Sequence, residues 1–186
     1  MEKKILNDFC FHKPKTLDEA LVLIDKYQEN GLLMEGGSEV IPNMKSLVVT
    51  PDHIISLKHI PEFNYITYTP GEGLHIGPSC TLTKVEYDPN VQSVYPSLYM
   101  GVHGMSNTNI HNISTVTGNI CYAVPSADTA APLLTLNAEL SVKSVDGERK
   151  VPITELFAGV RRTTLKKNEI VTDIFVPQPD PSYRLL

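Results

Sequence analysis

The sequence predicts an α+β fold with two lobes, a small βαβ lobe and a larger lobe built on a mixed sheet. In the first 58 residues, one amphipathic helical pattern is followed by short apolar runs separated by turn residues. From residue 65 onward, alternating strand patterns dominate. The length of 186 residues suits one cooperative unit with a sizeable core. We predict lobes at residues 1–58 and 59–177 and a proline-rich tail at residues 178–186.

Residues 16–27 carry the clearest helical signal. They begin with the capping box TLDE and continue with apolar side chains at helical spacing. The apolar run at residues 32–34 predicts a buried strand that leads into the glycine loop EGGSE at residues 35–39, with a helical turn beginning near Val40. Residues 53–57 predict a second strand of this lobe.

Strands of the second lobe are predicted at residues 65–69 and 74–77, on either side of the turn PGEG. Residues 138–145 alternate in polarity, and the dipeptide Asp-Gly that follows them predicts a hairpin with residues 149–153. Residues 169–177 predict the last strand. The second sheet is therefore assembled from segments far apart in the chain.

Composition and charge exclude several functional classes. Hydrophobic residues make up 41% of the chain and charged residues 20%, which is typical of a globular protein. The net charge of −5, with mixed signs, provides no basic stripe for nucleic acid, so a bound phosphate must be held by other groups. No apolar run is long enough for a signal peptide or a membrane span. We expect a cytoplasmic protein with no nucleic-acid partner.

Cysteines and histidines give no sign of a metal site. Cys10, Cys80 and Cys121 are far apart and odd in number, which predicts free thiols and no bound metal. Four histidines show no paired carboxylate and no metal-like spacing, so we expect surface or core positions and no catalytic residue. These are His53, His59, His75 and His103.

Two glycine-containing segments are the candidates for binding a phosphate group. The amides of Gly37, Ser38 and Glu39 are expected to point at one phosphate, because glycine lets a ligand approach the backbone. A plain tight turn is the alternative. The second segment, TVTGNI at residues 115–120, lies in a stretch rich in hydroxyl and amide side chains. There the alternative is a cluster of turns that satisfies its own backbone.

The roles expected in the second segment follow from side-chain chemistry. Gly118 allows close approach, Thr115 and Thr117 offer hydroxyls to phosphate oxygens, and Asn119 both donates and accepts. Downstream, Asp128 is expected to accept hydrogen bonds from ribityl or ribose hydroxyls, or alternatively to cap a helix that follows it. Neither segment matches the Rossmann or Walker pattern. If both segments bind one pyrophosphate, they must converge at a cleft between the lobes.

Five stretches together carry a family resemblance. They are KPKTLDEA at residues 13–20, GGSEVIP at 36–42, NIHNISTVTGNI at 109–120, VPSAD at 124–128 and VPITELFAG at 151–159. They resemble the FAD-binding domain of the molybdopterin dehydrogenase medium subunits, in which the second and third stretches typically read AGGTDL and QIRN-x-x-TIGGNI. The family includes the flavoproteins of carbon monoxide, xanthine and nicotinate dehydrogenases and of 4-hydroxybenzoyl-CoA reductase.

The resemblance implies a fold of the PCMH (vanillyl-alcohol-oxidase-like) type and FAD as the cofactor. It further implies that a molybdopterin-containing large subunit oxidises a substrate and a 2Fe-2S small subunit carries single electrons. FAD then collects two electrons for NAD or another acceptor. Relatives have a further C-terminal domain after the position of Leu186, so we expect a shortened chain. The residues expected to bind FAD, with Ile170 near the flavin, are Leu32, Leu33, Met34, Glu35, Gly36, Gly37, Ser38, Glu39, Thr115, Thr117, Gly118, Asn119, Asp128 and Ile170.

Three positions depart from the family pattern. Thr117 replaces the first glycine of a Gly-Gly pair, His111 replaces an arginine, and Glu35 replaces a small residue. If Thr117 needed a positive φ it would be strained, so either the conformation differs or its hydroxyl makes the phosphate contact. These departures keep two alternatives open. One is a structural or assembly subunit that has lost FAD, and the other is a module that binds a ligand without redox chemistry.

Overall fold

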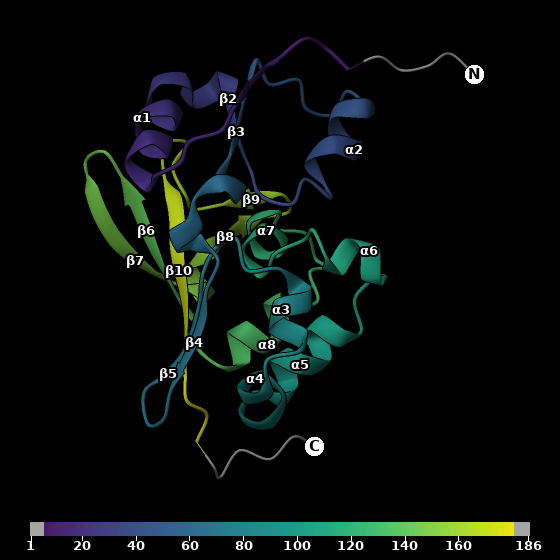
Figure 1. Ribbon diagram of the computed structural model, residues 1–186, viewed down its shortest axis with the longest axis vertical. Helices are drawn as coiled ribbons and strands as arrows, with labels where there is room; N and C mark the ends of the chain where they lie inside the picture. The colour runs from purple at the N-terminus through teal and green to yellow at the C-terminus, as the bar shows by residue number, and fades with distance from the viewer. Residues whose placement is uncertain (1–5, 181–186) are drawn as a thin grey trace.

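The computed structural model describes residues 6–180 and builds the chain on two principal sheets (Figure 1). The smaller sheet lies at one end of the molecule, next to α1. The larger sheet runs along one side, and most of the remaining helices gather on its opposite side (Figure 1). Of the predicted tail, residues 181–186 lie outside the described residues. The α+β class predicted from the sequence is confirmed.

The smaller sheet has three parallel strands in the order β1 (Cys10–His12), β3 (His53–Ser56) and β2 (Gly31–Met34). Helix α1 (Leu17–Tyr27) connects β1 to β2 by way of the 3-10 turn η1 (Gln28–Asn30). One of the two hydrogen bonds of the predicted capping box is present: the Thr16 hydroxyl oxygen accepts from the Glu19 amide at 3.2 Å. Glu19 Oε2 accepts from the Lys15 amide one residue earlier than the standard box requires.

The larger sheet has five strands in the order β4 (Ile66–Thr69), β5 (Gly73–Ile76), β10 (Ile170–Pro177), β6 (Glu139–Ser144) and β7 (Gly147–Pro152). Every pairing is antiparallel, so the mixed sheet expected for this lobe is corrected to an antiparallel one. The predicted hairpin is present, with a two-residue connection between β6 and β7. All five strands occur within a few residues of the predicted positions.

Short helices cover one face of the larger sheet, and most of them were not predicted from the sequence. Proline at the first turn and polar caps set their starts, because proline there loses no helical hydrogen bond. These helices are α3 (Leu82–Glu86), α4 (Pro89–Val94), α5 (Pro96–His103), α6 (Thr108–His111), α7 (Val116–Cys121), α8 (Ala130–Thr135) and α9 (Ile153–Leu156). Helix α2 (Val40–Lys45) lies at the end of the molecule that holds the smaller sheet (Figure 1). The remaining short elements are η2 (Leu57–His59), η3 (Pro61–Phe63), β8 (Phe157–Gly159) and β9 (Arg162–Thr163).

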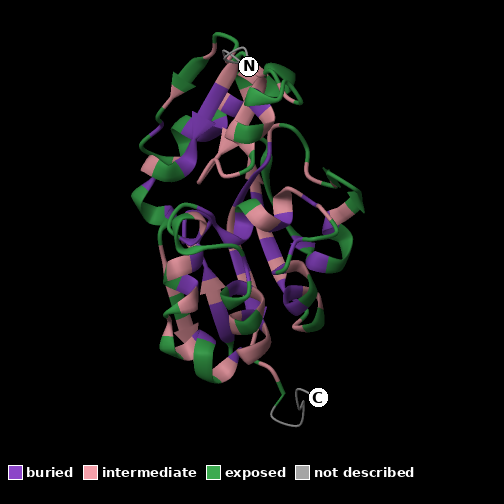
Figure 2. Cartoon of the chain, turned by 90° about the vertical axis from the view of Figure 1, so that its right-hand side faces the viewer, coloured by how far each residue is buried: buried purple, intermediate pink, exposed green. Residues whose placement is uncertain are grey.

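Two hydrophobic cores form, and β10 belongs to both. The larger core lies between the five-stranded sheet and the helices, and it includes Val171, Ile174 and Val176 of β10. The smaller core joins α1, β3, η2 and η3, and Ile170 at the start of β10 completes it. Buried residues run along strands of both sheets, while exposed residues cover the outer helix faces (Figure 2). Within residues 6–180, no helix combines the length and apolarity needed to cross a membrane.

Candidate functional site

A cleft of about 860 Å³ is bounded by the end of β2, the start of α7 and the β8–β9 hairpin. Its volume falls within the range of about 300–1,000 Å³ found for ligand pockets. The structure brings all but two of the residues predicted from the sequence to this cleft. Those that line it are Leu32, Leu33, Met34, Glu35, Gly36, Gly37, Ser38, Glu39, Thr115, Thr117, Gly118 and Asn119.

The two predicted phosphate-binding segments meet directly. A Cβ atom placed on Gly36 would lie 1.8 Å from the carbonyl oxygen of Ile113, so no other residue fits without moving one of the two backbones. Next to this contact, the Ser114 hydroxyl donates to the Ser38 hydroxyl oxygen at 2.8 Å. The expected convergence of the two segments is therefore confirmed. Gly36 serves the contact between the segments, whereas the sequence alone suggested a contact with ligand.

The glycine loop after β2 leaves its backbone donors open. Gly37 has φ +73°, a conformation that glycine adopts at little cost. The N–H groups of Gly37, Ser38 and Glu39 donate to no other group within residues 6–180. Consecutive open amides beside a positive-φ glycine form a concave site for an anion. This loop thus has the geometry that the sequence predicted for phosphate.

The second segment is helical, which corrects the prediction of a loop at residues 115–120. Thr115 is the N-cap of α7, and its hydroxyl oxygen accepts from the Gly118 amide at 2.9 Å. The side-chain amide oxygen Oδ1 of Asn119 accepts from the hydroxyl of Thr129 at 2.5 Å. Thr115 and Asn119 therefore use part of their hydrogen-bonding capacity within the protein. The alternative weighed for this segment, in which it satisfies its own backbone, is partly realised.

Two predicted residues do not line the cleft. Asp128 is exposed on the loop before α8, and Thr129, not Asp128, occupies the N-cap position of that helix. Ile170 is fully buried in the smaller core, and its neighbour Val171 lines the cleft instead. Strand alternation explains the exchange, because adjacent residues in β10 point to opposite sides.

Four basic side chains, which the sequence reasoning missed, line the cleft. They come from the β8–β9 hairpin and the loop after β9, and they are Arg161, Arg162, Lys166 and Lys167. The Arg161 guanidinium lies 5.2 Å from the centre of the Tyr122 ring, which also lines the cleft. The run RRTTLKK in a chain of net charge −5 was the available signal. These cations add to the backbone amides that the sequence offered for a phosphate, and which groups bind it stays a prediction.

A half-buried ion pair secures the loop that carries two of these cations. Arg149 on β7 donates through Nε and one terminal nitrogen to the two carboxylate oxygens of Glu169, both at 2.8 Å. Glu169 Oε2 also accepts from the Lys166 amide at 2.7 Å. The bond from Arg149 outweighs burial and lowers the pKa of Glu169. The loop is thus tied to the sheet immediately before β10 begins.

Comparison with known proteins identifies the family. A sequence model of the FAD binding domain in molybdopterin dehydrogenase matches residues 7–179. The chain belongs to this family. The resemblance stated from the motifs is therefore confirmed, and the two sheets form the FAD-binding domain of the carbon monoxide dehydrogenase medium-chain type.

This FAD-binding domain is also similar to individual relatives in sequence and in structure. The nicotinate dehydrogenase FAD-subunit of Eubacterium barkeri is 30% identical over 94% of this chain and 60% of its own length. The carbon monoxide dehydrogenase medium chain of Hydrogenophaga pseudoflava is 29% identical over 91% of this chain and 58% of its own. A solved structure of carbon monoxide dehydrogenase from Hydrogenophaga pseudoflava superimposes with a TM-score of 0.91 at 28% identity, covering 95% of this chain and 61% of that one. The chain thus spans about 60% of the length of these relatives.

Thr117 departs from the FAD-binding domain family without strain. It lies inside α7 and is not among the residues with positive φ, so the condition under which threonine would be strained is not met. Its side chain is 7% exposed, and its hydroxyl has no partner within residues 6–180. A buried hydroxyl without a partner costs about 1–3 kcal/mol, and this one belongs to a residue that lines the cleft. The first explanation, a different conformation, is what the structure shows, and contact of the hydroxyl with a phosphate stays a prediction.

Glu35 brings a buried carboxyl to the wall of this FAD-binding domain's cleft. Burial raises its pKa to about 7, against the opposing effects of a hydrogen bond from Ser79 and the charge of Lys58. The Ser79 hydroxyl donates to Oε2 at 2.8 Å, while Oε1 is buried and has no partner within residues 6–180. At this position, where relatives carry a small residue, the chain therefore has a carboxyl oxygen that makes no hydrogen bond.

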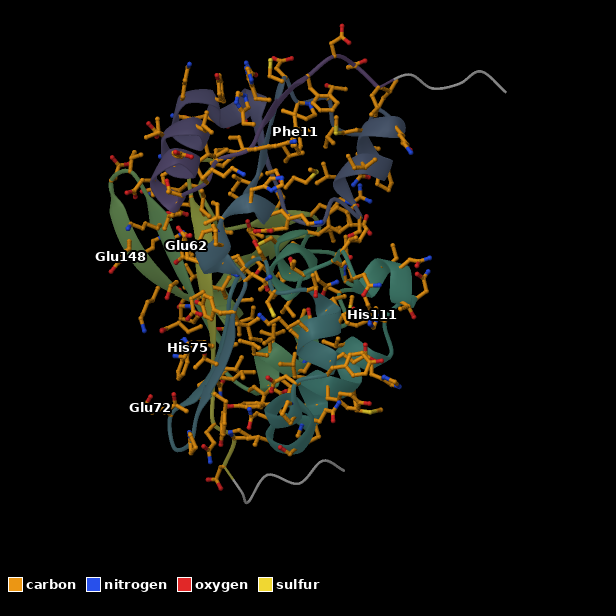
Figure 3. The ribbon with its side chains drawn as sticks, in the orientation of Figure 1. Phe11, Glu62, Glu72, His75, His111 and Glu148 are labelled. Atoms are coloured by element: carbon orange, nitrogen blue, oxygen red, sulfur yellow. The ribbon has the colours of Figure 1, made fainter. Side chains whose placement is uncertain are left out.

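His111, the third departure, lies outside the cleft on α6, away from the sheet that carries His75 (Figure 3). Its two ring nitrogens contact Glu86 Oε2 at 2.8 Å and the Met105 carbonyl oxygen. The prediction that His75 and His103 have no carboxylate partner is wrong, because His75 contacts Asp173 at 2.7 Å and His103 contacts Glu86 at 2.8 Å. The carboxylate partners all come from positions at least 17 residues away in the chain. Within residues 6–180, no three histidine, cysteine or acidic side chains are grouped to hold a metal ion.

Proposed function

We propose that this chain binds FAD in the cleft and serves as the flavin subunit of a molybdenum-dependent hydroxylase or dehydrogenase. One observation carries the proposal. The open amides of the Gly37 loop and the unpartnered hydroxyl of Thr117 lie on two segments that Gly36 and Ser38 hold in contact. Both kinds of group donate to phosphate oxygens, and together they suit a pyrophosphate on an otherwise acidic protein.

The remaining walls of the cleft suit the other parts of FAD. Apolar side chains of β2, such as Leu33 and Met34, offer a surface for a flat ring system. Arg161, Arg162 and Lys166 add positive charge, which favours an anionic ligand. Bound FAD supplies two-electron chemistry that also exchanges single electrons, while the protein binds and orients it and excludes water. Asp128 and Ile170 have no direct contact in this proposal.

A structural subunit that binds no cofactor is the competing reading, and the cleft argues against it. In that case Thr117 Oγ1 and Glu35 Oε1 would remain buried without partners, and such groups are rare in folded proteins. A purely structural role also gives no reason for the basic side chains to gather around the cleft, because no anionic ligand would bind there. A ligand of FAD's size and charge satisfies both.

Flavin titration tests the proposal. The purified chain is titrated with FAD and, separately, with FMN, and flavin fluorescence reports binding. We expect FAD to bind at least about tenfold more tightly, because the second phosphate and the adenosine add contacts worth more than about 1.4 kcal/mol. Failure to bind FAD, or equal affinity for the two flavins, would contradict the proposal.

The assembly around this subunit is part of the same proposal. Similar proteins are named medium chains and FAD subunits of carbon monoxide and nicotinate dehydrogenases. By analogy, we propose a molybdopterin-containing large subunit and a 2Fe-2S small subunit as partners, NAD or another acceptor, and a cytoplasmic location. The division into lobes at residue 58 stays a prediction. Co-expression with both subunits should give one complex on size-exclusion chromatography, and separate elution would contradict these partners.

Replacing Thr117 by valine separates a binding role from a structural one. We expect FAD affinity to fall about tenfold, because a hydrogen bond to a charged acceptor is lost. The free energy of unfolding of the cofactor-free chain should rise by about 1 kcal/mol, because the buried hydroxyl no longer lacks a partner. FAD titration and urea unfolding measure the two effects.

Two further variants serve as controls for this change. Thr117→Ser keeps the hydroxyl and should keep most of the affinity. Thr117→Gly restores the glycine of relatives but costs about 1 kcal/mol in a helix and removes the hydroxyl. Tighter FAD binding by Thr117→Gly would show that the hydroxyl makes no useful contact.

A further inference from the structure

Glu35 stands where the two halves of the cleft wall meet. It follows β2 directly and precedes Gly36, the residue that touches the backbone before α7. Glu35 and Cys121 of α7 line the same cleft. Burial raises the pKa of Cys121 to about 12, and the charge of Glu35 adds to this effect. Thr117 lies one helical turn before Cys121, on the same side of the helix. The carboxyl and this helix face form one wall of the cleft. Glu35 and Thr117, both on this wall, each carry a buried polar atom without a hydrogen-bond partner.

The groups around the carboxyl leave it without a charge partner. Ser79, before α3, donates one hydrogen bond to Oε2, and Lys58 on η2 exerts a weaker attraction that burial outweighs. Cys121 on α7 is the other titratable group that faces it. Glu35 forms no ion pair within residues 6–180, although four cations line other parts of the cleft. With a pKa of about 7, the carboxyl binds or releases its proton in the physiological range.

We propose that Glu35 takes up a proton from solvent when the cleft binds its flavin dinucleotide, and that the neutral carboxyl then donates from Oε1 to an acceptor atom of the cofactor. This inference rests on the proposed function. Two effects favour the protonated form in the complex. The cofactor brings negative phosphates, and its ring system displaces water from the wall, so the cost of a carboxylate increases. An ionised carboxylate only accepts hydrogen bonds, whereas the acid has one O–H donor to offer.

Proton uptake makes cofactor affinity depend on pH in a defined direction. Binding that takes up a proton weakens as pH rises, because fewer protons are available above the pKa of the free protein. The dissociation constant for FAD should increase about tenfold for each pH unit by which binding raises the pKa of Glu35. The increase should occur above neutral pH and should be absent below about pH 6, where the carboxyl is already protonated in the free chain.

Calorimetric titration of the chain with FAD in two buffers of different ionisation enthalpy measures the protons taken up. We expect wild type to take up between about half a proton and one proton per FAD slightly above neutral pH. Glu35→Gln, which keeps the shape of the side chain but cannot titrate, should take up close to none and should bind FAD with an affinity independent of pH. Glu62→Gln, at an exposed carboxylate away from the cleft, should behave as wild type.

The outcomes separate this inference from the proposed function. If FAD fails to bind at any pH, the proposed function falls and the inference with it. If FAD binds with equal proton uptake in wild type and Glu35→Gln, the inference alone is overturned. If Glu35→Gln does not fold, proton uptake by the wild-type chain alone still tests the inference. Zero uptake across the neutral and mildly alkaline range would overturn the proposal, and uptake that peaks there would support it.

Discussion

Gly36→Ala is expected to abolish FAD binding and to lower the free energy of unfolding by about 3 kcal/mol. The added methyl group would occupy the place of the Ile113 carbonyl oxygen, 1.8 Å away, so one of the two backbones must move. The phosphate-binding loop and α7 are joined at this point, and a shift of about 1 Å between them is enough to misplace the groups that bind the cofactor. FAD titration and urea unfolding measure the two losses.

Gly71→Ala is the matched control for that change. Gly71, unlike Gly36, has a positive φ, but a Cβ atom there meets nothing within 4 Å, and the residue lies in the turn between β4 and β5. We expect a cost of about 1 kcal/mol from backbone strain and an unchanged affinity for FAD. Wild-type affinity in Gly36→Ala would show that contact between the two segments is not needed for binding.

Glu35→Gln should raise the stability of the cofactor-free chain at pH 8 by about 3 kcal/mol. The pKa of this carboxyl is raised from 4.5 to about 7 in the folded protein, so folding favours the protonated form. Each pH unit of difference between folded and unfolded pKa is worth about 1.4 kcal/mol. The penalty is absent below pH 4.5, grows as pH rises towards 7 and is complete above it. Glutamine removes the charge and hence the penalty.

Urea unfolding at several pH values measures this effect. Wild type and Glu35→Gln should have similar stability near pH 4 and should separate progressively as the pH rises to 8. Glu62→Gln controls for the loss of one negative charge at an exposed site, and its stability should follow that of wild type throughout. A constant difference between Glu35→Gln and wild type at all pH values would mean that the carboxyl does not titrate with a raised pKa.

The sequence predicted those elements whose local signals agree with their tertiary environment. Helix α1 has both a capping box and an apolar stripe, and its stripe packs into the smaller core as expected. The hairpin of β6 and β7 follows from alternation and from the Asp-Gly turn. The Gly37 loop was found for the same reason, because the strand before it and the glycines in it are local features.

The missed features depend on partners that lie far away in the chain. Helix α7 contains a glycine and β-branched residues, which disfavour a helix, yet the Thr115 cap and burial of Val116 and Ile120 stabilise it. His75 meets Asp173 only because β5 and β10 pair in the sheet. Arg161 and Arg162 reach the cleft through a hairpin whose position no local pattern reveals. Local patterns therefore located one wall of the site and part of the other.

The position of Ile170 in the smaller core has a consequence for how the protein is made. The other residues of that core come from positions 20–63, so the N-terminal lobe is packed against a residue synthesised more than a hundred positions later. During translation the core of that lobe stays incomplete, and part of its apolar surface stays exposed, until β10 has left the ribosome. Contacts so distant in sequence also slow folding. We expect folding of nascent chains to be completed in a single late step, with a chaperone-sensitive interval before it.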